Sequence, residues 1–211
     1  MRGRNKLNDY LFKATLLVLS RTVIQAQSLR KKMRLNWNNM KRILVALLLV
    51  ILAFCMGWLF CFDNYHEVIS GQLYRSGQMS ASQLSRHADH DRIATVINLR
   101  PDTNETWYVE EVKVCGQSGI CHVDFPMQGD VPPTRERMTD LVSLMRRSAR
   151  PMLIHCTHGA DRTGLAIALY LNAVENRPPA EAAQALSLKY GHLPVMKAFD
   201  RAFREYYEES K

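Results

Sequence analysis

The stretch Met152–Leu171, MLIHCTHGADRTGLAIALYL, decides the fold because it places one cysteine between an expected strand and an expected helix. It begins with three apolar residues and a histidine, Met152–His155, and this pattern predicts a buried strand. The apolar run in Thr163–Asn176 predicts a long helix. A short turn containing Gly159 joins them. Cys156 and Arg162 stand at the ends of this turn, with five residues between them.

This turn has the features of an anion-binding cradle. Backbone N–H groups of a turn and of a first helical turn converge on one point and hold an anion there. Gly159 permits a conformation that other residues resist, and the planar fork of Arg162 fits two oxygens of a phosphoryl group. The same N–H groups stabilise a thiolate at Cys156. We therefore expect the sulfur to attack a bound phosphate ester and form a phosphocysteine, which water then hydrolyses.

The signature of the Cys-based protein phosphatases is His-Cys, five residues, then Arg-Ser/Thr, and His155, Cys156, Arg162, Thr163 and Gly164 match it in order. The segment therefore resembles the tyrosine and dual-specificity phosphatase superfamily. Its GADRTG ending is similar to bacterial dual-specificity-like members and to the lipid-phosphatase-like branch. Three further segments look like recurring parts of the bacterial group: LYRSGQ (Leu73–Gln78), TVINLR (Thr95–Arg100) and YGHLP (Tyr190–Pro194).

The resemblance implies that the loop binds phosphate through Thr157, His158, Gly159, Ala160, Asp161 and Arg162. We expect His158 to face the pocket entrance. Asp161 has two interpretations: it orients water or a substrate hydroxyl, or it satisfies loop N–H groups at the surface. Two side chains are expected to support the nucleophile. His155 would fix the loop through its ring nitrogens, and Thr163 would donate to the sulfur when it leaves phosphorus.

The general acid has two candidates. The leaving oxygen needs a proton, which the resemblance assigns to an aspartate on a mobile loop that follows a strand. Asp130 lies in FPMQGDVPP, a loop rich in Gly and Pro, whereas Asp124 lies in HVDFP, which predicts a strand. The Phe-Pro and Pro-Pro frame is similar to the acid loop of lipid-directed members, whose acid aligns at Gly129. Loop placement favours Asp130; a helix-capping role near Pro133 is the alternative.

Strand and helix patterns alternate from residue 64 onward. The predicted strands are Gln72–Arg75, Ala94–Leu99, Ile120–Phe125 and Met152–His155. The predicted helices are Ser80–His90 with Ser80 as N-cap, Asn104 or Glu105 to Val114, Pro133–Arg147, Thr163–Asn176, Pro179–Tyr190 and Val195–Tyr207. This alternation predicts an α/β domain over residues 64–211, with a mixed central sheet flanked by helices. The resemblance covers about the same part of the chain and implies a dual-specificity-phosphatase-like fold.

The positive net charge of the chain comes from its N-terminal segment. Residues 1–42 contain eleven Lys and Arg and one acidic residue, so a net charge of +8 for the whole chain leaves about −2 for the rest. The charge therefore says nothing about the substrate of the domain and does not support nucleic-acid binding. We interpret residues 1–42 as a basic cytoplasmic tail; a start at Met33 or Met40 would remove most of it.

Residues 43–62, ILVALLLVILAFCMGWLFCF, carry no charge and predict a transmembrane anchor. Twenty helical residues rise about 30 Å, which matches the hydrocarbon core of a bilayer. A buried core helix of this kind is unusual in so small a domain, and a cleaved signal would need a small-x-small site that is missing here. Positive charge before the anchor favours a cytoplasmic N-terminus. We therefore expect a single-pass membrane protein with its catalytic domain in the bacterial periplasm.

The cysteines predict no metal site. Neither a Cys-x-x-Cys pair nor a His/Cys set with ligand spacing occurs in the sequence, and the expected mechanism uses no metal and no other cofactor. Cys115 and Cys121 lie close together in the sequence. They could form a small disulfide loop in an oxidising space or remain thiols, and both states stay open.

The sequence thus predicts a phosphatase that hydrolyses phosphomonoesters on phosphoprotein, at Tyr or Ser/Thr, or on a membrane phospholipid. A membrane anchor holds the site beside the bilayer, which brings the lipid substrate to parity with protein. The alternative is a catalytically weak module of the same fold that binds phosphorylated partners. Rhodanese-like sulfur chemistry also uses a Cys-headed loop, but the Arg-Thr-Gly ending disfavours it. The oligomeric state stays open.

Overall fold

The structure is a computed structural model that describes residues 25, 27, 36–37, 39–53, 63–193, 195 and 197–209. The chain divides into two compact units, Met1–Met56 and Gly57–Lys211. Residues 39–53 are helical, whereas most of the basic tail and residues 54–62 of the expected anchor lie outside the described residues. Among the residues that are described, no helix combines the length and apolarity needed to cross a bilayer. The anchor and the boundaries around it stay predictions.

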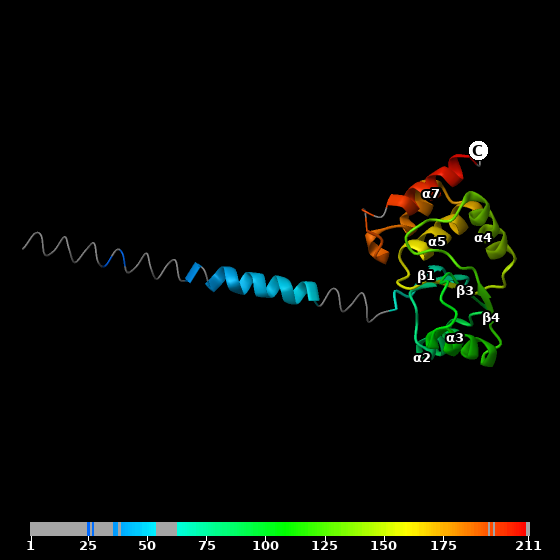
Figure 1. Ribbon diagram of the computed structural model, residues 1–211, viewed down its shortest axis with the longest axis horizontal. Coiled ribbons are helices and arrows are strands. Elements are labelled where there is room, and N and C mark those ends of the chain that lie inside the picture. The colour runs from blue at the N-terminus through cyan, green and yellow to red at the C-terminus, as the bar shows by residue number, and fades with distance from the viewer. Residues whose placement is uncertain are drawn as a thin grey trace, which may run out of the picture. The chain divides into compact units, whose positions relative to one another are not determined.

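A mixed sheet forms the centre of the second unit (Figure 1). Its five strands are β1 (His66–Ile69), β2 (Leu73–Ser76), β3 (Thr95–Asn98), β4 (Cys121–Asp124) and β5 (Met152–His155). Their order is β1-β2-β5-β3-β4; β1 runs antiparallel to β2 and every other pair is parallel. Because β5 is central, Cys156 emerges at the carboxyl edge of the sheet, where open α/β sheets place their ligands.

Helices cover both faces of this sheet and confirm the predicted α/β class (Figure 1). One face carries α2 (Ala81–Asp91) and α3 (Thr106–Gln117); the other carries α4 (Arg135–Arg147), α5 (Asp161–Ala173) and α7 (Lys197–Glu208). Two cores result, a larger one around α5 and a smaller one around Leu84 and Val96. The strands β2, β3 and β5 are buried along their whole length, as expected of parallel strands covered on both faces.

Most of the predicted elements are confirmed to within a few residues. Ser80 is the N-cap of α2, as predicted, and it forms a capping box in which its side chain accepts from the N–H of Gln83. Helix α3 continues to Gln117, three residues beyond its predicted end. Strand β1 was not predicted. It lies at the edge of the sheet, and its four residues, HEVI, form too short a pattern to indicate a strand.

The single helix predicted over Pro179–Tyr190 is wrong. The segment instead forms a short α6 (Pro179–Ala182) and two 3-10 turns, η1 (Ala183–Ala185) and η2 (Leu188–Tyr190). The carbonyl of Ala185 accepts a hydrogen bond from Nη1 of Arg75 at 2.9 Å. This carbonyl also lies so close to α5 that a Cβ on Gly164 would approach it to 2.9 Å. Tertiary packing against α5 and β2 therefore replaces the regular helical hydrogen bonds.

Candidate active site

The turn between β5 and α5 packs directly on the backbone at the end of β2. Gly159 has a φ of +70°, in the left-handed region. A Cβ at this position would lie 2.6 Å from the backbone of Ser76 and Gly77, so only glycine fits. The N–H of Gln78 donates to the carbonyl of Thr157 at 3.0 Å and fixes the other half of the turn. The sequence prediction of a glycine-dependent turn agrees with this geometry.

The sulfur of Cys156 lies at the base of this turn. The side chain is 3% exposed, and Sγ accepts a hydrogen bond from the N–H of Gly159 at 3.3 Å. It faces a cavity of about 200 Å³. The cavity is lined by Gly129, Cys156, Thr157, His158, Ala160, Asp161 and Arg162. The structure therefore brings the predicted nucleophile together with five of the six predicted phosphate-binding residues; Gly159 shapes the turn instead.

Helix α5 begins beside the sulfur. It starts at Asp161, two residues before its predicted start, so Arg162 lies in its first turn. The N-cap residue Ala160 provides no side-chain hydrogen bond, which leaves the first-turn N–H groups available to an anion. This arrangement supplies the positive end of a helix dipole at the cavity.

The guanidinium of Arg162 spans the cavity. Nη2 donates to Oγ1 of Thr157 at 2.9 Å, and Nη1 donates to the carbonyl of Met127 at 3.3 Å. The first bond holds the guanidinium over the loop, and the second ties it to the segment that precedes α4. Both contacts orient the planar fork, which is the geometry needed to bind two oxygens of a phosphoryl group.

The buried side chain of Arg75 holds the backbone of the loop. This side chain is completely buried, Nη2 donates to the carbonyl of Gly159 at 2.7 Å, and the guanidinium stacks on the ring of Tyr190 at 3.8 Å. Burial lowers the pKa of Arg75 to about 10, while its electrostatic interaction with Tyr190 and Cys156 opposes that shift. A cation in this position favours an anion in the loop, whether thiolate or phosphate.

A buried carboxylate contacts the histidine that precedes Cys156. Oε1 of Glu111 faces Nε2 of His155 at 3.1 Å and Nε2 of His122 at 2.9 Å, and Oε2 accepts from Gln78 at 2.9 Å. Burial opposes ionisation of Glu111, but the charge and hydrogen bonds of these partners outweigh it and hold the pKa of the carboxyl well below its usual range. His155 is therefore tied to α3 through one ring nitrogen and an acid that the sequence prediction missed, whereas its Nδ1 has no hydrogen-bond partner among the described residues. Its role in fixing the loop stays a prediction.

A second histidine connects the loop to α7. Nδ1 of His192 faces Oδ1 of Asp161 at 2.5 Å, and its Nε2 faces Oδ2 of Asp200 at 2.9 Å. His192 is 3% exposed and lies in the YGHLP segment. Asp161 thus both lines the cavity and is held by a buried ring. His192 has no role in the sequence-based prediction, although its segment YGHLP resembles a recurring part of the bacterial group.

Asp124, the less favoured acid candidate, lies in the sheet. Its Oδ1 accepts from Nδ2 of Asn98 at 2.8 Å, and its Oδ2 accepts from Oη of Tyr108 at 2.6 Å. Both carboxylate oxygens are therefore engaged at the end of β4. The residue does not line the catalytic cavity.

Asp130, the favoured candidate, is exposed on the segment between β4 and α4. Its neighbour Gly129 lines the cavity, and a Cβ on Gly129 would lie 3.8 Å from Nη2 of Arg162. The segment therefore passes over Arg162, but the side chain of Asp130 is not among those that line the cavity. The helix-capping alternative is not seen, since Thr134 caps α4.

Three other predicted features can be located. The Oγ1 of Thr163 is buried without a hydrogen-bond partner in the described part of the chain, so the sulfur accepts from Gly159 and not from Thr163. Cys115 and Cys121 are free thiols, and burial raises the pKa of Cys115 to about 12. Across the described ranges, no three His, Cys, Asp or Glu side chains converge as metal ligands.

Solved structures with this fold come from bacteria and yeast. A cysteine-to-serine form of P. aeruginosa TpbA, solved in complex with pTyr, is 22% identical with a TM-score of 0.57, covering 70% of this chain and 87% of that one. A DUF442 phosphatase from Shewanella putrefaciens CN-32 is 21% identical with a TM-score of 0.56, covering 72% and 95%. The catalytic core of the S. cerevisiae PP-IP phosphatase SIW14 is 19% identical with a TM-score of 0.56, covering 70% and 92%.

These likenesses establish the fold. A comparison with curated proteins found no match. A family model, described as "DSP-PTPase phosphatase fused to NAD+ Kinase", matches residues 63–198, from just before β1 into the start of α7. The match spans more than half of the chain and includes the whole catalytic loop. The chain therefore belongs to this family of DSP-PTPase phosphatases, PTP-NADK.

Proposed function

We propose that this protein hydrolyses phosphomonoesters through a phosphocysteine intermediate at Cys156. The observation that carries the proposal is the common cavity of the Cys156 sulfur, the Arg162 guanidinium and the N-terminus of α5. Sulfur attacks phosphorus, so that an S–P bond forms while the P–O bond to the leaving group breaks. Water then attacks phosphorus, the S–P bond breaks, and phosphate leaves as the thiolate returns.

Asp130 is the proposed proton donor to the leaving oxygen. It lies on an exposed segment next to the cavity-lining Gly129, so a small movement of that segment brings its carboxyl over the site. Asp161 lies in the cavity and faces His192, a contact that holds its carboxyl group in place to orient water. Thr163 is proposed to donate its buried hydroxyl to the sulfur as that sulfur leaves phosphorus.

Hydrolysis of p-nitrophenyl phosphate in the presence of a chelator tests this proposal. The wild-type protein should turn over, and Cys156→Ser should abolish turnover. Asp130→Asn should lower kcat by about 10²–10⁴-fold, the usual contribution of a general acid, and Asp124→Asn should change it little. A wild-type protein without turnover under these conditions would remove the enzyme assignment. It would leave the alternative, a module that binds phosphorylated partners without hydrolysing them.

The proposed substrates are phosphoprotein, at Tyr or Ser/Thr, and membrane phospholipid. TpbA was solved with pTyr and SIW14 is named a PP-IP phosphatase, so this fold accepts substrates of more than one size. A panel of phosphopeptides, phosphoinositides and phosphatidylglycerol phosphate would rank the classes by kcat/KM. Equal rates throughout the panel would argue against a dedicated substrate of either class.

We also propose that residues 43–62 anchor the chain in the bacterial inner membrane, with the N-terminus in the cytoplasm and the catalytic domain in the periplasm. The apolar, uncharged run and the basic segment before it support this topology. An alkaline phosphatase reporter fused after Lys211 should be active, because that enzyme folds only outside the cytoplasm. An inactive reporter on a stably expressed fusion would reverse the proposed orientation.

A further inference from the structure

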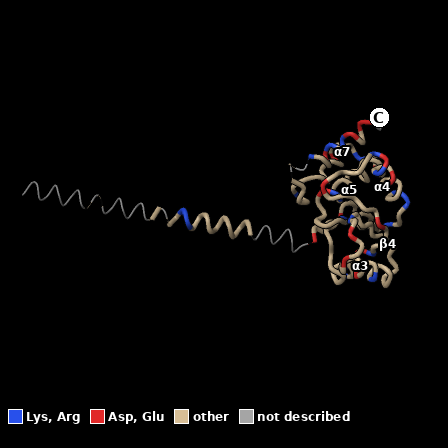
Figure 2. The backbone as a smooth tube through the Cα atoms, viewed as in Figure 1, with Lys and Arg blue, Asp and Glu red and all other residues tan. Residues whose placement is uncertain are grey.

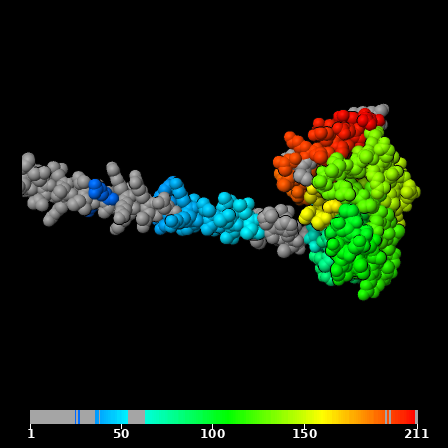
Figure 3. Space-filling view, in the orientation of Figure 1, coloured from blue at the N-terminus to red at the C-terminus, as the bar shows by residue number. Residues whose placement is uncertain are grey.

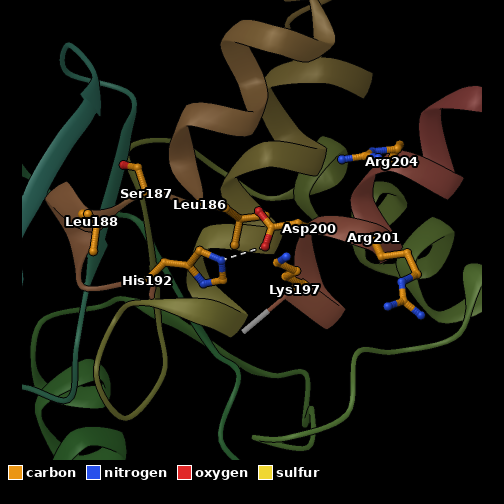
Figure 4. A pocket seen from close by; sticks show the side chains of 8 residues that line it. All are labelled: Leu186, Ser187, Leu188, His192, Lys197, Asp200, Arg201 and Arg204. Atoms are coloured by element: carbon orange, nitrogen blue, oxygen red, sulfur yellow. Dashed lines mark hydrogen bonds and ion pairs between the residues drawn. The ribbon is translucent and has the colours of Figure 1, made fainter. Parts of the chain in front are cut away.

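A second pocket lies beside the catalytic loop, between α7 and the segment Leu186–Leu188 (Figure 4). Its volume is about 530 Å³, larger than that of the cavity around Cys156. Lys197, Arg201 and Arg204 contribute its basic side chains, and all three come from α7. Leu186, Ser187, Leu188 and His192 line the pocket from the segment that precedes α7 (Figure 4). Such a pocket offers positive charge on one side and an apolar surface on the other.

The three cations share one face of α7. Lys197, Arg201 and Arg204 are spaced by four and three residues, which places them on one stripe of a helix. Figure 2 shows basic positions along α7 within a domain where both signs are mixed. No carboxylate within the described ranges forms an ion pair with any of the three. Their charges are therefore available to an external anion.

The acidic residue of this pocket is already engaged. Oδ2 of Asp200 faces Nε2 of His192, which points toward it across the pocket wall (Figure 4). The other ring nitrogen of His192 faces Asp161. Asp200 is therefore already in contact with the ring, and the three basic side chains that line the pocket outnumber its one carboxylate.

The pocket adjoins the catalytic cavity. One imidazole ring, that of His192, separates Asp200 in the pocket from Asp161 in the cavity wall. Asn64 links the loop to the segment just before His192, since its Nδ2 donates to the carbonyls of His158 and Tyr190 at 2.8 and 2.9 Å. Figure 3 shows the yellow surface near residue 155 next to the orange segment that precedes α7.

We propose that this pocket is a second anion subsite, and that the substrate is a small molecule carrying at least two phosphate groups. One phosphate would lie over Cys156, and the other would contact Lys197, Arg201 and Arg204, with the intervening carbon skeleton against Leu186. Arginine forks bind phosphate through two parallel hydrogen bonds, which suits the two arginines of the stripe. This inference rests on the proposed function only in placing the first phosphate in the catalytic cavity.

Binding calorimetry on full-length Cys156→Ser protein tests the subsite without any turnover. The probes are hexyl phosphate, which has one phosphate, and the bisphosphates of butanediol, hexanediol and octanediol, which vary the distance between two phosphates. At least one bisphosphate should bind about tenfold or more tightly than hexyl phosphate, which corresponds to about 1.4 kcal/mol. Adding Arg201→Gln and Arg204→Gln should abolish this gain and leave hexyl phosphate binding unchanged.

The matched control is Arg86→Gln with Lys113→Gln in the same background, which removes the same charge from exposed positions on α2 and α3. It should retain the gain. Equal affinity of all bisphosphates and hexyl phosphate would overturn the proposal, as would a gain that survives loss of both arginines.

A surface for anionic lipid is the competing use of the stripe. If the arginine variant loses binding to phosphatidylglycerol vesicles but keeps the bisphosphate gain, the stripe is a membrane contact and the subsite is refuted. Failure of the proposed function is seen separately. The wild-type protein could fail to hydrolyse p-nitrophenyl phosphate while its Cys156→Ser form shows the bisphosphate gain. That result would support the second anion subsite and refute the proposed enzymatic activity.

Discussion

Replacing Gly159 by alanine should damage both the stability and the catalytic loop. The residue combines two constraints: a φ of +70° and a backbone neighbour, at Ser76 and Gly77, that a Cβ would approach to 2.6 Å. Left-handed backbone costs a residue with a side chain about 1–2 kcal/mol. The neighbouring atoms belong to the sheet backbone and cannot rotate away, and overpacking of this kind costs about 1–3 kcal/mol more. We therefore expect Gly159→Ala to lower the free energy of unfolding by about 2–5 kcal/mol.

The loop should also move. Restoring an ordinary contact of 3.4 Å from 2.6 Å requires a shift of nearly 1 Å, and a misplacement of that size near reacting groups costs about 10²-fold in rate. Gly119→Ala is the matched control, because Gly119 has a φ of +68° and nothing within 4 Å of its Cβ position. It should lose about 1–2 kcal/mol from the backbone term alone and keep its activity.

Urea unfolding of the three proteins, with kcat on p-nitrophenyl phosphate measured alongside, separates these effects. The difference between Gly159→Ala and Gly119→Ala in unfolding free energy isolates the contact with the end of β2. A Gly159→Ala protein with the stability of Gly119→Ala and wild-type kcat would refute the close packing of the loop on β2.

Three further substitutions test the groups around the loop. Glu111→Gln should cost about 2–4 kcal/mol at neutral pH because it removes a buried charge from its partners. Since folding lowers the pKa of Glu111 below its ordinary 4.5, its contribution is present above pH 4.5 and is lost as the pH falls toward the folded value. Urea unfolding from pH 7 to pH 3 should thus show a smaller decline for Glu111→Gln than for wild type; parallel curves would contradict this. Arg75→Lys should lose at least one of three carbonyl contacts and the stacking on Tyr190, lowering stability by about 1–3 kcal/mol and weakening inhibition by inorganic phosphate; an unchanged Ki would show that the loop does not depend on the hydrogen bonds of the guanidinium. His192→Gln should lower kcat about tenfold by releasing Asp161, whereas Asp200→Asn, one ring further from the cavity, should have a smaller effect; the reverse order would refute the positioning role of His192.

The central part of the fold could be predicted from local patterns. The strand before Cys156, the helix after it and the capping of α2 are each specified within a few consecutive residues, and the structure confirms them. The turn itself has Gly159 in a left-handed conformation, as expected of a glycine there, but its contact with Ser76 and Gly77 joins segments that are distant in the sequence. Short-range patterns of this kind are reliable because backbone conformation and burial act on the same few residues.

The missed features depend on contacts between distant segments. Glu111 stands four residues before the buried Cys115 on the inward face of α3, and this was the one sign of its role. Its partner His155 is 44 residues away. The helix expected over Pro179–Tyr190 breaks because Arg75, far away in the sequence, takes the carbonyl of Ala185. A single sequence does not show which distant partner a buried polar group finds.

The acid assignment shows the same difficulty. Loop composition predicted Asp130, and the structure places that segment over Arg162 with Gly129 as the residue that lines the cavity. The packing of one segment on another decides which of two neighbouring residues faces the site. Local sequence patterns carry little information about such a register.

The most direct test of the central claim is rapid-quench peptide mass spectrometry during turnover of a phosphomonoester, with Asp161→Asn included as a variant in which water is less well oriented. One phosphoryl group should be found on the peptide that carries Cys156, should accumulate in the variant, and should be absent in Cys156→Ser. Turnover without phosphate on Cys156, or with phosphate on His155 or His158 instead, would contradict the account.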